Sequence, residues 1–255
     1  MADGAVPQVL LMPGAVLPAA AAYEGLLQHL GEGVEARLKD PELYAKDAPA
    51  EDWSLDREVD GVLAAADAAG FERFHFVGYS AGATVGLLLA ARRPERVRSL
   101  ALLEVAWAGN GGLTPEEERV WRRFSEILRL PPPQLMAEFV RAQLAPGVAP
   151  PPPPDGPPPP WMATRPAGLA ALQQAFEEHG FELEELRGYR RPVYYALGGR
   201  SNPDHYRRQA ERLADVLTDF TLEVFEDRHH FDPPHRAEPA RLAASLSDLW
   251  RRADA

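Results

Sequence analysis

Short apolar runs alternate with amphipathic segments along most of this 255-residue chain. Compact runs rich in Val, Leu and Phe are typical of buried strands, and apolar residues spaced three and four apart are typical of helices. The pattern predicts strands at 9–12, 34–38, 74–77, 97–105, 193–197 and 220–225. It predicts helices at 19–30, 54–69, 83–92, 204–217 and 238–251.

Strands that alternate with helices predict right-handed crossovers and a sheet that is covered on both faces. The fold class that we predict is therefore α/β, with a doubly wound and mostly parallel sheet. Ligands of such sheets bind at the carboxyl ends of the strands. Every candidate catalytic residue described below falls at such an end.

The alternation stops between residues 109 and 191, where the pattern predicts amphipathic helices at 115–130, at 134–144 and, in one or two pieces, at 168–186. Nine of the eleven residues at 150–160 are proline, which excludes helix and central strand and favours polyproline II. We interpret 1–108 and 192–255 as the core domain and 109–191 as an inserted, mainly helical lid. The proline segment is either a stiff surface spacer or a strut that fixes one wall of the lid.

Composition narrows the classes of function. The net charge of −11 argues against a nucleic-acid partner and against an anionic membrane surface. The chain has no cysteine, which excludes disulfides, thiolate zinc sites and a cysteine nucleophile. No segment approaches the ~20 apolar residues that span a bilayer, and the N-terminus lacks the basic region of a signal peptide. We expect a cytoplasmic protein with a small-molecule substrate, and we assign no oligomeric state.

The most informative motif is Gly78-Tyr79-Ser80-Ala81-Gly82, which lies between a predicted strand and a predicted helix. Glycines two residues before and after the serine permit a very tight turn, because a Cβ there would clash. The serine oxygen then stands above the sheet edge at a helix N-terminus, which favours negative charge. The motif therefore predicts a nucleophilic serine, with an ordinary glycine-rich turn as the alternative.

A serine needs a base, and the segment after the last predicted strand offers His229, His230 and His235. A neutral imidazole can take the serine proton near pH 7 and return it to the leaving group. These histidines with Asp232 could instead bind a metal. That interpretation is weaker, because the segment has no helical His-x-x-x-His pair and the chain has no cysteine.

Glu104 is the one charged residue in the otherwise mainly apolar run 99–107, which covers most of a predicted strand. Burying an ionised carboxylate is costly unless it is paired or hydrogen-bonded. The Nδ1–H of a catalytic histidine is such a partner. Glu104 is therefore our candidate for the acid, and a buried glutamate bonded to backbone or arginine is the alternative.

On these motifs, nearly the whole chain resembles the α/β-hydrolase superfamily. The resemblance implies that Met12-Pro13-Gly14-Ala15-Val16 is the oxyanion loop, with Pro13 in place of the usual histidine. The donors would be the backbone N–H groups of Ala81 and of Ala15 or Val16. The resemblance also favours His230 as the base, because an apolar residue, Phe231, follows it. His229 and His235 remain the alternatives.

The resemblance leaves two positions for the acid. Many members place an aspartate just after the strand that corresponds to 193–197, where this chain has Ser201, Asn202 and, later, Asp204. A branch of the haloalkane dehalogenases carries a glutamate whose spacing from the nucleophile resembles that from Ser80 to Glu104. We prefer Glu104 and keep Asp204 as the alternative acid, although Pro203-Asp204 also fits a turn and helix cap. A dyad without a strong acid is a third possibility.

Together these features predict a serine hydrolase that cleaves an ester or thioester of a small to medium apolar substrate, without cofactor or metal. Tyr79, Trp107 and Trp161 are candidate pocket residues, and Phe176 could join the two tryptophans in an apolar wall. One alternative on the same triad is a hydrolase of C–C bonds, lactones or amides, or a lyase. Another is a ligand-binding protein on a hydrolase scaffold with little turnover.

Overall fold

The computed structural model describes residues 6–46, 48–152 and 156–255. Its six strands form one sheet in the order β2-β1-β3-β4-β5-β6, and each neighbouring pair is parallel. The predicted fold class is confirmed. The strands are β1 (Gln8–Met12), β2 (Glu35–Leu38), β3 (Phe74–Ser80), β4 (Val97–Val105), β5 (Val193–Gly198) and β6 (Phe220–Phe225).

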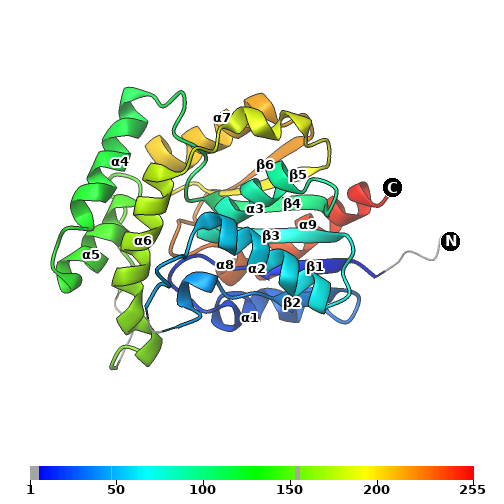
Figure 1. Ribbon diagram of the computed structural model, residues 1–255, viewed down its shortest axis with the longest axis horizontal. Helices are drawn as coiled ribbons and strands as arrows, with labels where there is room; N and C mark the ends of the chain where they lie inside the picture. The colour runs from blue at the N-terminus through cyan, green and yellow to red at the C-terminus, as the bar shows by residue number, and fades with distance from the viewer. Residues whose placement is uncertain (1–5, 47, 153–155) are drawn as a thin grey trace.

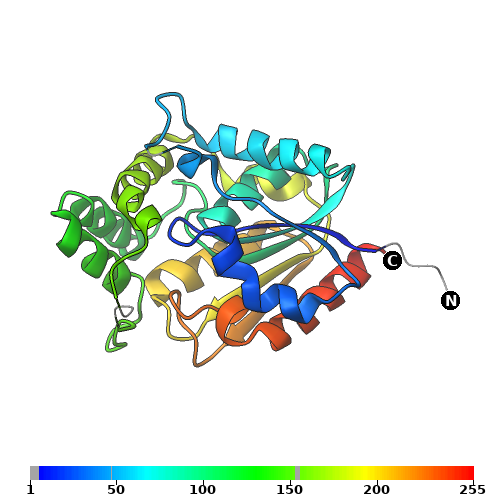
Figure 2. The same ribbon diagram turned by 90° about the horizontal axis from the view of Figure 1, so that it is seen from below.

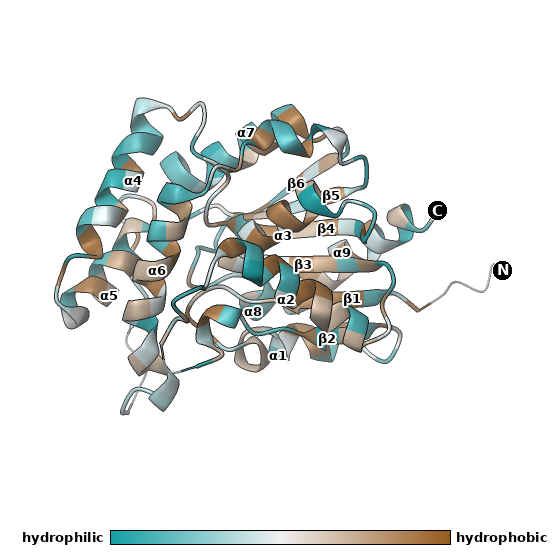
Figure 3. Ribbon diagram, viewed as in Figure 1, coloured by the Kyte–Doolittle hydropathy of each residue, from teal (hydrophilic) through white to brown (hydrophobic). Residues whose placement is uncertain are grey.

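The two faces of the sheet are covered by separate helix layers, which Figure 2 shows on either side of the strands. One layer holds α2 (Leu55–Ala68), α3 (Ala81–Arg92) and α7 (Arg208–Val216), and the other holds α1 (Ala19–Leu30), α8 (Pro234–Ala237) and α9 (Pro239–Ala253). An apolar cluster fills the space between each layer and the sheet. Figure 3 shows the most hydrophobic ribbon in α3 and the central strands. β3 and β4 are apolar on both faces because both faces are covered.

Most predicted helices lie within a few residues of their predicted limits. The helical stretch predicted at 168–186 forms two pieces, α6 (Arg165–Glu178) and the 3-10 turn η3 (Leu183–Gly188). Ser54 caps α2, with its side chain accepting the N–H of Arg57. The helix predicted at 204–217 begins as a π-helical turn, η4 (Pro203–Arg207), before α7. The short elements η1 (Glu42–Tyr44) and α8 were not predicted, because three or four residues carry too little periodicity.

In the described part of the segment between β4 and β5, three α-helices lie together beyond the carboxyl ends of the strands (Figure 1). They are α4 (Pro115–Ile127), α5 (Pro132–Ala142) and α6 (Arg165–Glu178), with the short turns η2 (Pro160–Thr164) and η3 (Leu183–Gly188). We call this group the lid helices. Residues 153–155 of the proline segment lie outside the described residues, and Pro159 has the polyproline II angles φ −59° and ψ 149°. None of the described helices is long and apolar enough to cross a membrane.

A fully buried histidine on α8 makes the fold sensitive to acid. His235 lies between the rings of Tyr23 and Tyr79, at centroid distances of 5.1 and 4.7 Å, and neither ring nitrogen has a hydrogen-bond partner among the described residues. Burial, with smaller contributions from Arg236 and His230, lowers the pKa of His235 from 6.5 to about 3. The unfolded chain therefore binds a proton below pH 6.5 that the folded chain rejects, so stability falls as the pH drops toward 3.

The His235→Phe variant should lose this part of the acid sensitivity, because an apolar ring fills the site without titrating. Between pH 7 and pH 5 the wild type should lose about 2 kcal/mol more unfolding free energy than the variant. Urea unfolding at the two pH values measures the difference. The exposed His29→Gln variant is the control and should behave as the wild type does. Equal pH dependence in wild type and His235→Phe would contradict this prediction.

Candidate active site

Ser80 occupies a strained turn where β3 passes directly into α3. Its backbone has φ 53° and ψ −116°, a conformation that residues other than glycine rarely adopt and that clusters at functional sites. The flanking glycines are required by close approach. A Cβ on Gly78 would lie 2.4 Å from the carbonyl oxygen of Gly82, and a Cβ on Gly82 would lie 2.4 Å from that of Met12.

Glu104 is the extra residue of a β-bulge between β3 and β4. Tyr79 pairs with Leu103, but Ser80 pairs with Val105, so Glu104 has no partner in the register. Its φ of 50° is also in the left-handed region. Bulges re-aim a side chain out of the regular alternation. Here Leu103 faces one apolar cluster and Val105 the other, although alternation would place both on the same face.

A chain of hydrogen bonds links three elements of the core. The Nε2 atom of His230 lies 3.1 Å from Ser80 Oγ, and its Nδ1 lies 2.9 Å from Glu104 Oε2. The N–H of Gly198, at the end of β5, donates to Glu104 Oε1 at 2.8 Å. The His230 and Glu104 residues are only 3% and 1% exposed. A carboxylate accepts the Nδ1–H, which leaves Nε2 free to accept a proton from the serine.

Two tyrosine rings hold the imidazole of His230. The ring of Tyr206 stacks on it at 4.5 Å with an interplanar angle of 17°, and the ring of Tyr79 stacks at 5.0 Å. The Tyr79 hydroxyl also donates to the backbone carbonyl of His230. The Tyr79 side chain therefore supports the histidine loop, and it does not line the cavity beside Ser80.

The other sequence candidates lie outside this chain of hydrogen bonds. Nδ1 of His229 accepts the N–H groups of Phe231 and Asp232. Burial lowers the pKa of His229, with smaller effects from nearby charges. Asp204 is exposed at the start of η4, where its backbone N–H donates to Asn202 Oδ1. Within the described residues, no group of three or more His, Cys, Asp or Glu side chains could hold a metal ion.

The loop after β1 lies against the nucleophile. A Cβ on Gly14 would come within 2.9 Å of Ser80 Cβ, and Ala15 and Ala81 line the same cavity as Ser80. Two backbone carbonyls of this loop accept hydrogen bonds from side chains elsewhere in the protein. The Tyr44 hydroxyl donates to the Ala15 carbonyl at 2.7 Å. The next carbonyl, that of Val16, accepts a hydrogen bond from a lid residue.

That lid residue is Arg165, at the start of α6, whose Nε–H donates to the Val16 carbonyl at 2.8 Å. Its guanidinium carbon lies 3.9 Å from the ring centroid of Tyr44 and 4.9 Å from that of Trp161. Arg165 is 4% exposed, so it is neither solvated nor open to a substrate. Trp161 covers this arginine instead of lining the cavity.

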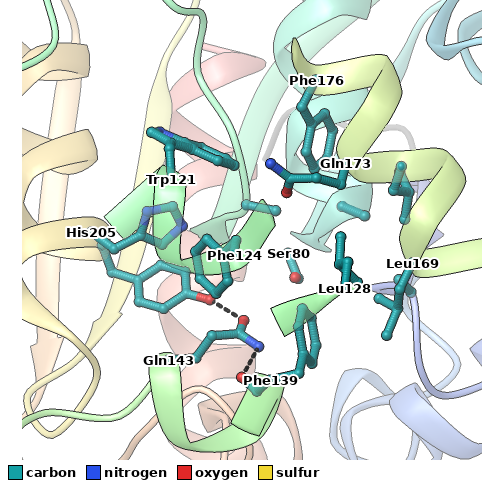
Figure 4. Close-up of a pocket in the computed structure, with 15 residues that line it drawn as sticks. Ser80, Trp121, Phe124, Leu128, Phe139, Gln143, Leu169, Gln173, Phe176 and His205 are labelled. Carbon is teal, nitrogen blue, oxygen red and sulfur yellow. Dashed lines mark hydrogen bonds between the residues drawn. The ribbon is translucent and has the colours of Figure 1, made fainter. Parts of the chain in front are cut away.

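An apolar cavity lies between Ser80 and the lid helices (Figure 4). It has about 450 Å³ of space, counting its opening to solvent. Among the described residues that line it, none is Asp, Glu, Lys or Arg. The wall consists mainly of aromatic and leucine side chains from the lid, namely Trp121, Phe124, Leu128, Phe139, Leu169, Leu172 and Phe176, with Gln143, Gln173, His205 and Tyr206 as the polar members.

Of the aromatic residues singled out in the sequence, Phe176 lines the cavity and Trp107 does not. Trp107 lies behind the wall, where its ring stacks on Phe176 at 5.4 Å and its Nε1–H donates to Asn110. The aromatic residues Trp121, Phe124 and Phe139 were missed. Their helices were predicted, but the face that meets Ser80 depends on how the lid packs on the core.

Comparisons with known proteins agree with this architecture. A protein from Klebsiella pneumoniae (strain 342), described as the carbamate hydrolase RutD, is 43% identical over 63 residues, which are 25% of this chain and only 21% of that relative. A membrane phospholipase A, a bacterial virulence factor, has a TM-score of 0.70 at 20% identity, covering 97% of this chain and 79% of the other. The naproxen esterase of Bacillus subtilis has a TM-score of 0.64 at 18% identity, covering 97% and 85%.

At these identities the two solved structures show a common fold only. The comparison with family models establishes the family, because a model of the alpha/beta hydrolase family matches residues 9–245, nearly the whole chain. This protein therefore belongs to the alpha/beta hydrolase family.

Proposed function

We propose that the protein is a serine hydrolase that cleaves a carboxylic ester or thioester with an uncharged apolar acyl group. The observation that carries this proposal is the hydrogen-bond chain from Ser80 through His230 to Glu104, which ends at the apolar cavity. A nucleophile, a base and an orienting acid in this order are the parts of acyl transfer through a covalent intermediate.

In the first half of the proposed reaction, Ser80 Oγ attacks the substrate carbonyl and its proton passes to His230 Nε2. The tetrahedral oxyanion collapses, and the alcohol or thiol leaves with the proton from His230. In the second half, water attacks the acyl-enzyme while His230 takes its proton. The second tetrahedral intermediate then collapses, His230 returns this proton to Ser80 Oγ, and the carboxylic acid departs. Glu104 remains ionised and stabilises the imidazolium in both halves.

The oxyanion in this proposal is bound by the backbone N–H of Ala81 and that of Ala15 or Val16. The bonds from Tyr44 and Arg165 to the carbonyls of Ala15 and Val16 support this assignment, because they hold the loop in one orientation. Donors that are fixed before the reaction stabilise developing charge without reorganising. Arg165 acts in this scheme as a positioning residue.

The lining of the cavity favours a neutral acyl group. None of its described residues is Asp, Glu, Lys or Arg, and burial lowers the pKa of His205 to about 3 and raises the pKa of Tyr206. A substrate carboxylate there would therefore lose its hydration without gaining a charged partner. An apolar ester meets no such cost. The strained backbone of Ser80 favours an enzyme over a binding protein, because such strain persists where function requires it.

The proposal is tested with a fluorophosphonate probe and a panel of short-chain p-nitrophenyl esters and thioesters. Peptide mapping should find a single adduct, on Ser80, and the panel should show turnover. Failure to label Ser80 would exclude it as the nucleophile. Labelling without turnover of any ester or thioester would favour the ligand-binding alternative, and turnover of amides, lactones or C–C substrates alone would favour that class.

A further inference from the structure

Gln173 is a polar residue in an otherwise apolar wall of the cavity. It lies on α6 between the cavity-lining Leu172 and Phe176, and it is only 9% exposed. Figure 4 shows its side chain extending from α6 into the cavity, with the amide oxygen on the side toward Ser80. Among the described residues, no donor forms a hydrogen bond with this oxygen.

The orientation of the Gln173 amide is set by its neighbours. Its Nε2 donates to Glu177 Oε1 at 2.9 Å and lies 3.3 Å from Ser125 Oγ. Hydrogen bonds from Gln173 and then Ser125 lower the pKa of Glu177, so its carboxylate is ionised and can only accept. Turning the amide over would place its oxygen against that carboxylate. The amide nitrogen therefore faces Glu177, and the amide oxygen faces the cavity.

The second amide of the cavity is already satisfied within the protein. Gln143 Oε1 accepts from the Tyr206 hydroxyl at 2.5 Å, and its Nε2 donates to the Phe139 carbonyl at 3.0 Å. Figure 4 shows both bonds as dashed lines. Gln173 thus differs from Gln143, because its Oε1 accepts no hydrogen bond from any described residue. A bound group that fills the cavity would remove water from this oxygen, so a group that supplies a hydrogen-bond donor is favoured there over one that does not.

We propose that Gln173 Oε1 recognises a hydrogen-bond donor on the group of the substrate that occupies the cavity. The substrate class is then an ester or thioester whose neutral apolar group carries a hydroxyl or an amide-type N–H. This inference rests on the proposed function, because the same cavity would hold the acyl group attacked by Ser80. A site that binds a substrate donor rejects the matched group without one, since the acceptor is then left unpaired.

The test uses matched substrates that differ only in the donor. For the N–H, these are the methyl esters of N-acetylglycine and 4-oxopentanoic acid, in which CH₂ replaces NH. For the hydroxyl, they are p-nitrophenyl phenylacetate and its 3- and 4-hydroxy derivatives. The wild type should prefer at least one donor-bearing member by about 10- to 100-fold in kcat/KM. In Gln173→Met, this preference should fall to near unity, mainly because kcat/KM for the donor-bearing ester falls.

Gln174→Met is the matched control. Gln174 is exposed on the same helix and makes the same type of bond, with its Nε2 donating to Glu178 Oε1 at 2.9 Å, so its loss should leave the preference intact. Fluorophosphonate labelling of Ser80 is measured in every variant and reports the proposed function independently of Gln173.

If Ser80 is labelled and esters are hydrolysed, the inference is overturned when wild type shows no preference in either set. The same holds when Gln173→Met keeps the wild-type preference. If Ser80 is not labelled and no ester reacts, the proposed function and this inference fail together. The wild-type preference alone decides the outcome if Gln173→Met does not fold.

Discussion

The Ser80→Ala variant is expected to lose ester hydrolysis, with kcat reduced at least about 10⁴-fold, toward the limit of detection. The alanine leaves His230 and the cavity in place but removes the atom that forms the acyl-enzyme. The initial burst of p-nitrophenol should disappear together with the steady-state rate, because both follow acylation. The fluorophosphonate adduct should disappear as well.

The unfolding temperature of the variant distinguishes a loss of catalysis from a loss of folded structure. The Ser80→Ala substitution keeps the backbone of the turn, so the unfolding temperature of the variant should remain close to that of wild type. Ser247→Ala, which removes an exposed hydroxyl on α9, is the control and should retain full activity and labelling. A Ser80→Ala enzyme that still shows a burst would require a different nucleophile.

Glu104→Gln is expected to lower kcat by about 10²- to 10⁴-fold, the range for losing the carboxylate that orients a catalytic histidine. The physical reason lies in the hydrogen bond from Gly198. Its N–H would keep the amide oxygen of the new side chain, which places the amide NH₂ opposite His230 Nδ1. Nδ1 would then have to accept, and the proton would move to Nε2, where it blocks removal of the serine proton.

Asp204→Asn is the matched test of the alternative acid. Asp204 is exposed, and its backbone rather than its carboxylate is bound to Asn202, so the variant should keep near wild-type kcat. Steady-state kinetics on one ester compare the two variants directly. An active Glu104→Gln enzyme with an inactive Asp204→Asn enzyme would reverse the assignment.

The sequence predicts the core well because its signals are local. The inner strands β1, β3, β4 and β5 are compact and mainly apolar runs, and the glycines around Ser80 mark a turn that only small residues permit. Glu104 was identified by a similar argument, as a charge that an apolar strand has to compensate. The bulge that aims its side chain could not be predicted. It depends on the pairing of β4 with β3, and strict alternation would have placed Glu104 over a helix layer.

The cavity was less predictable because it forms between elements that are distant in sequence. Trp107 and Phe176 stack on each other, yet only Phe176 borders the open space. Tyr79 adjoins the nucleophile, but its ring points to His230 and not to the cavity. The amphipathic pattern locates the lid helices. It does not specify which of their apolar residues meets Ser80, because both the core and the cavity bury apolar side chains.

The loop after β5 connects the core to the lid. Asn202 donates its backbone N–H to the Gln143 carbonyl at 3.0 Å and its side-chain amide to the Ala142 carbonyl at 2.8 Å, at the end of α5. With the acid proposed on β4, we assign this loop no proton-transfer role. It joins the lid helices to the core, where the N–H groups of Gly199 and Arg200 bind the Phe225 and Arg228 carbonyls. We expect that variation at Asn202 can change which substrates enter while the reacting groups stay unchanged, so selection for a new substrate has a route that spares the chemistry.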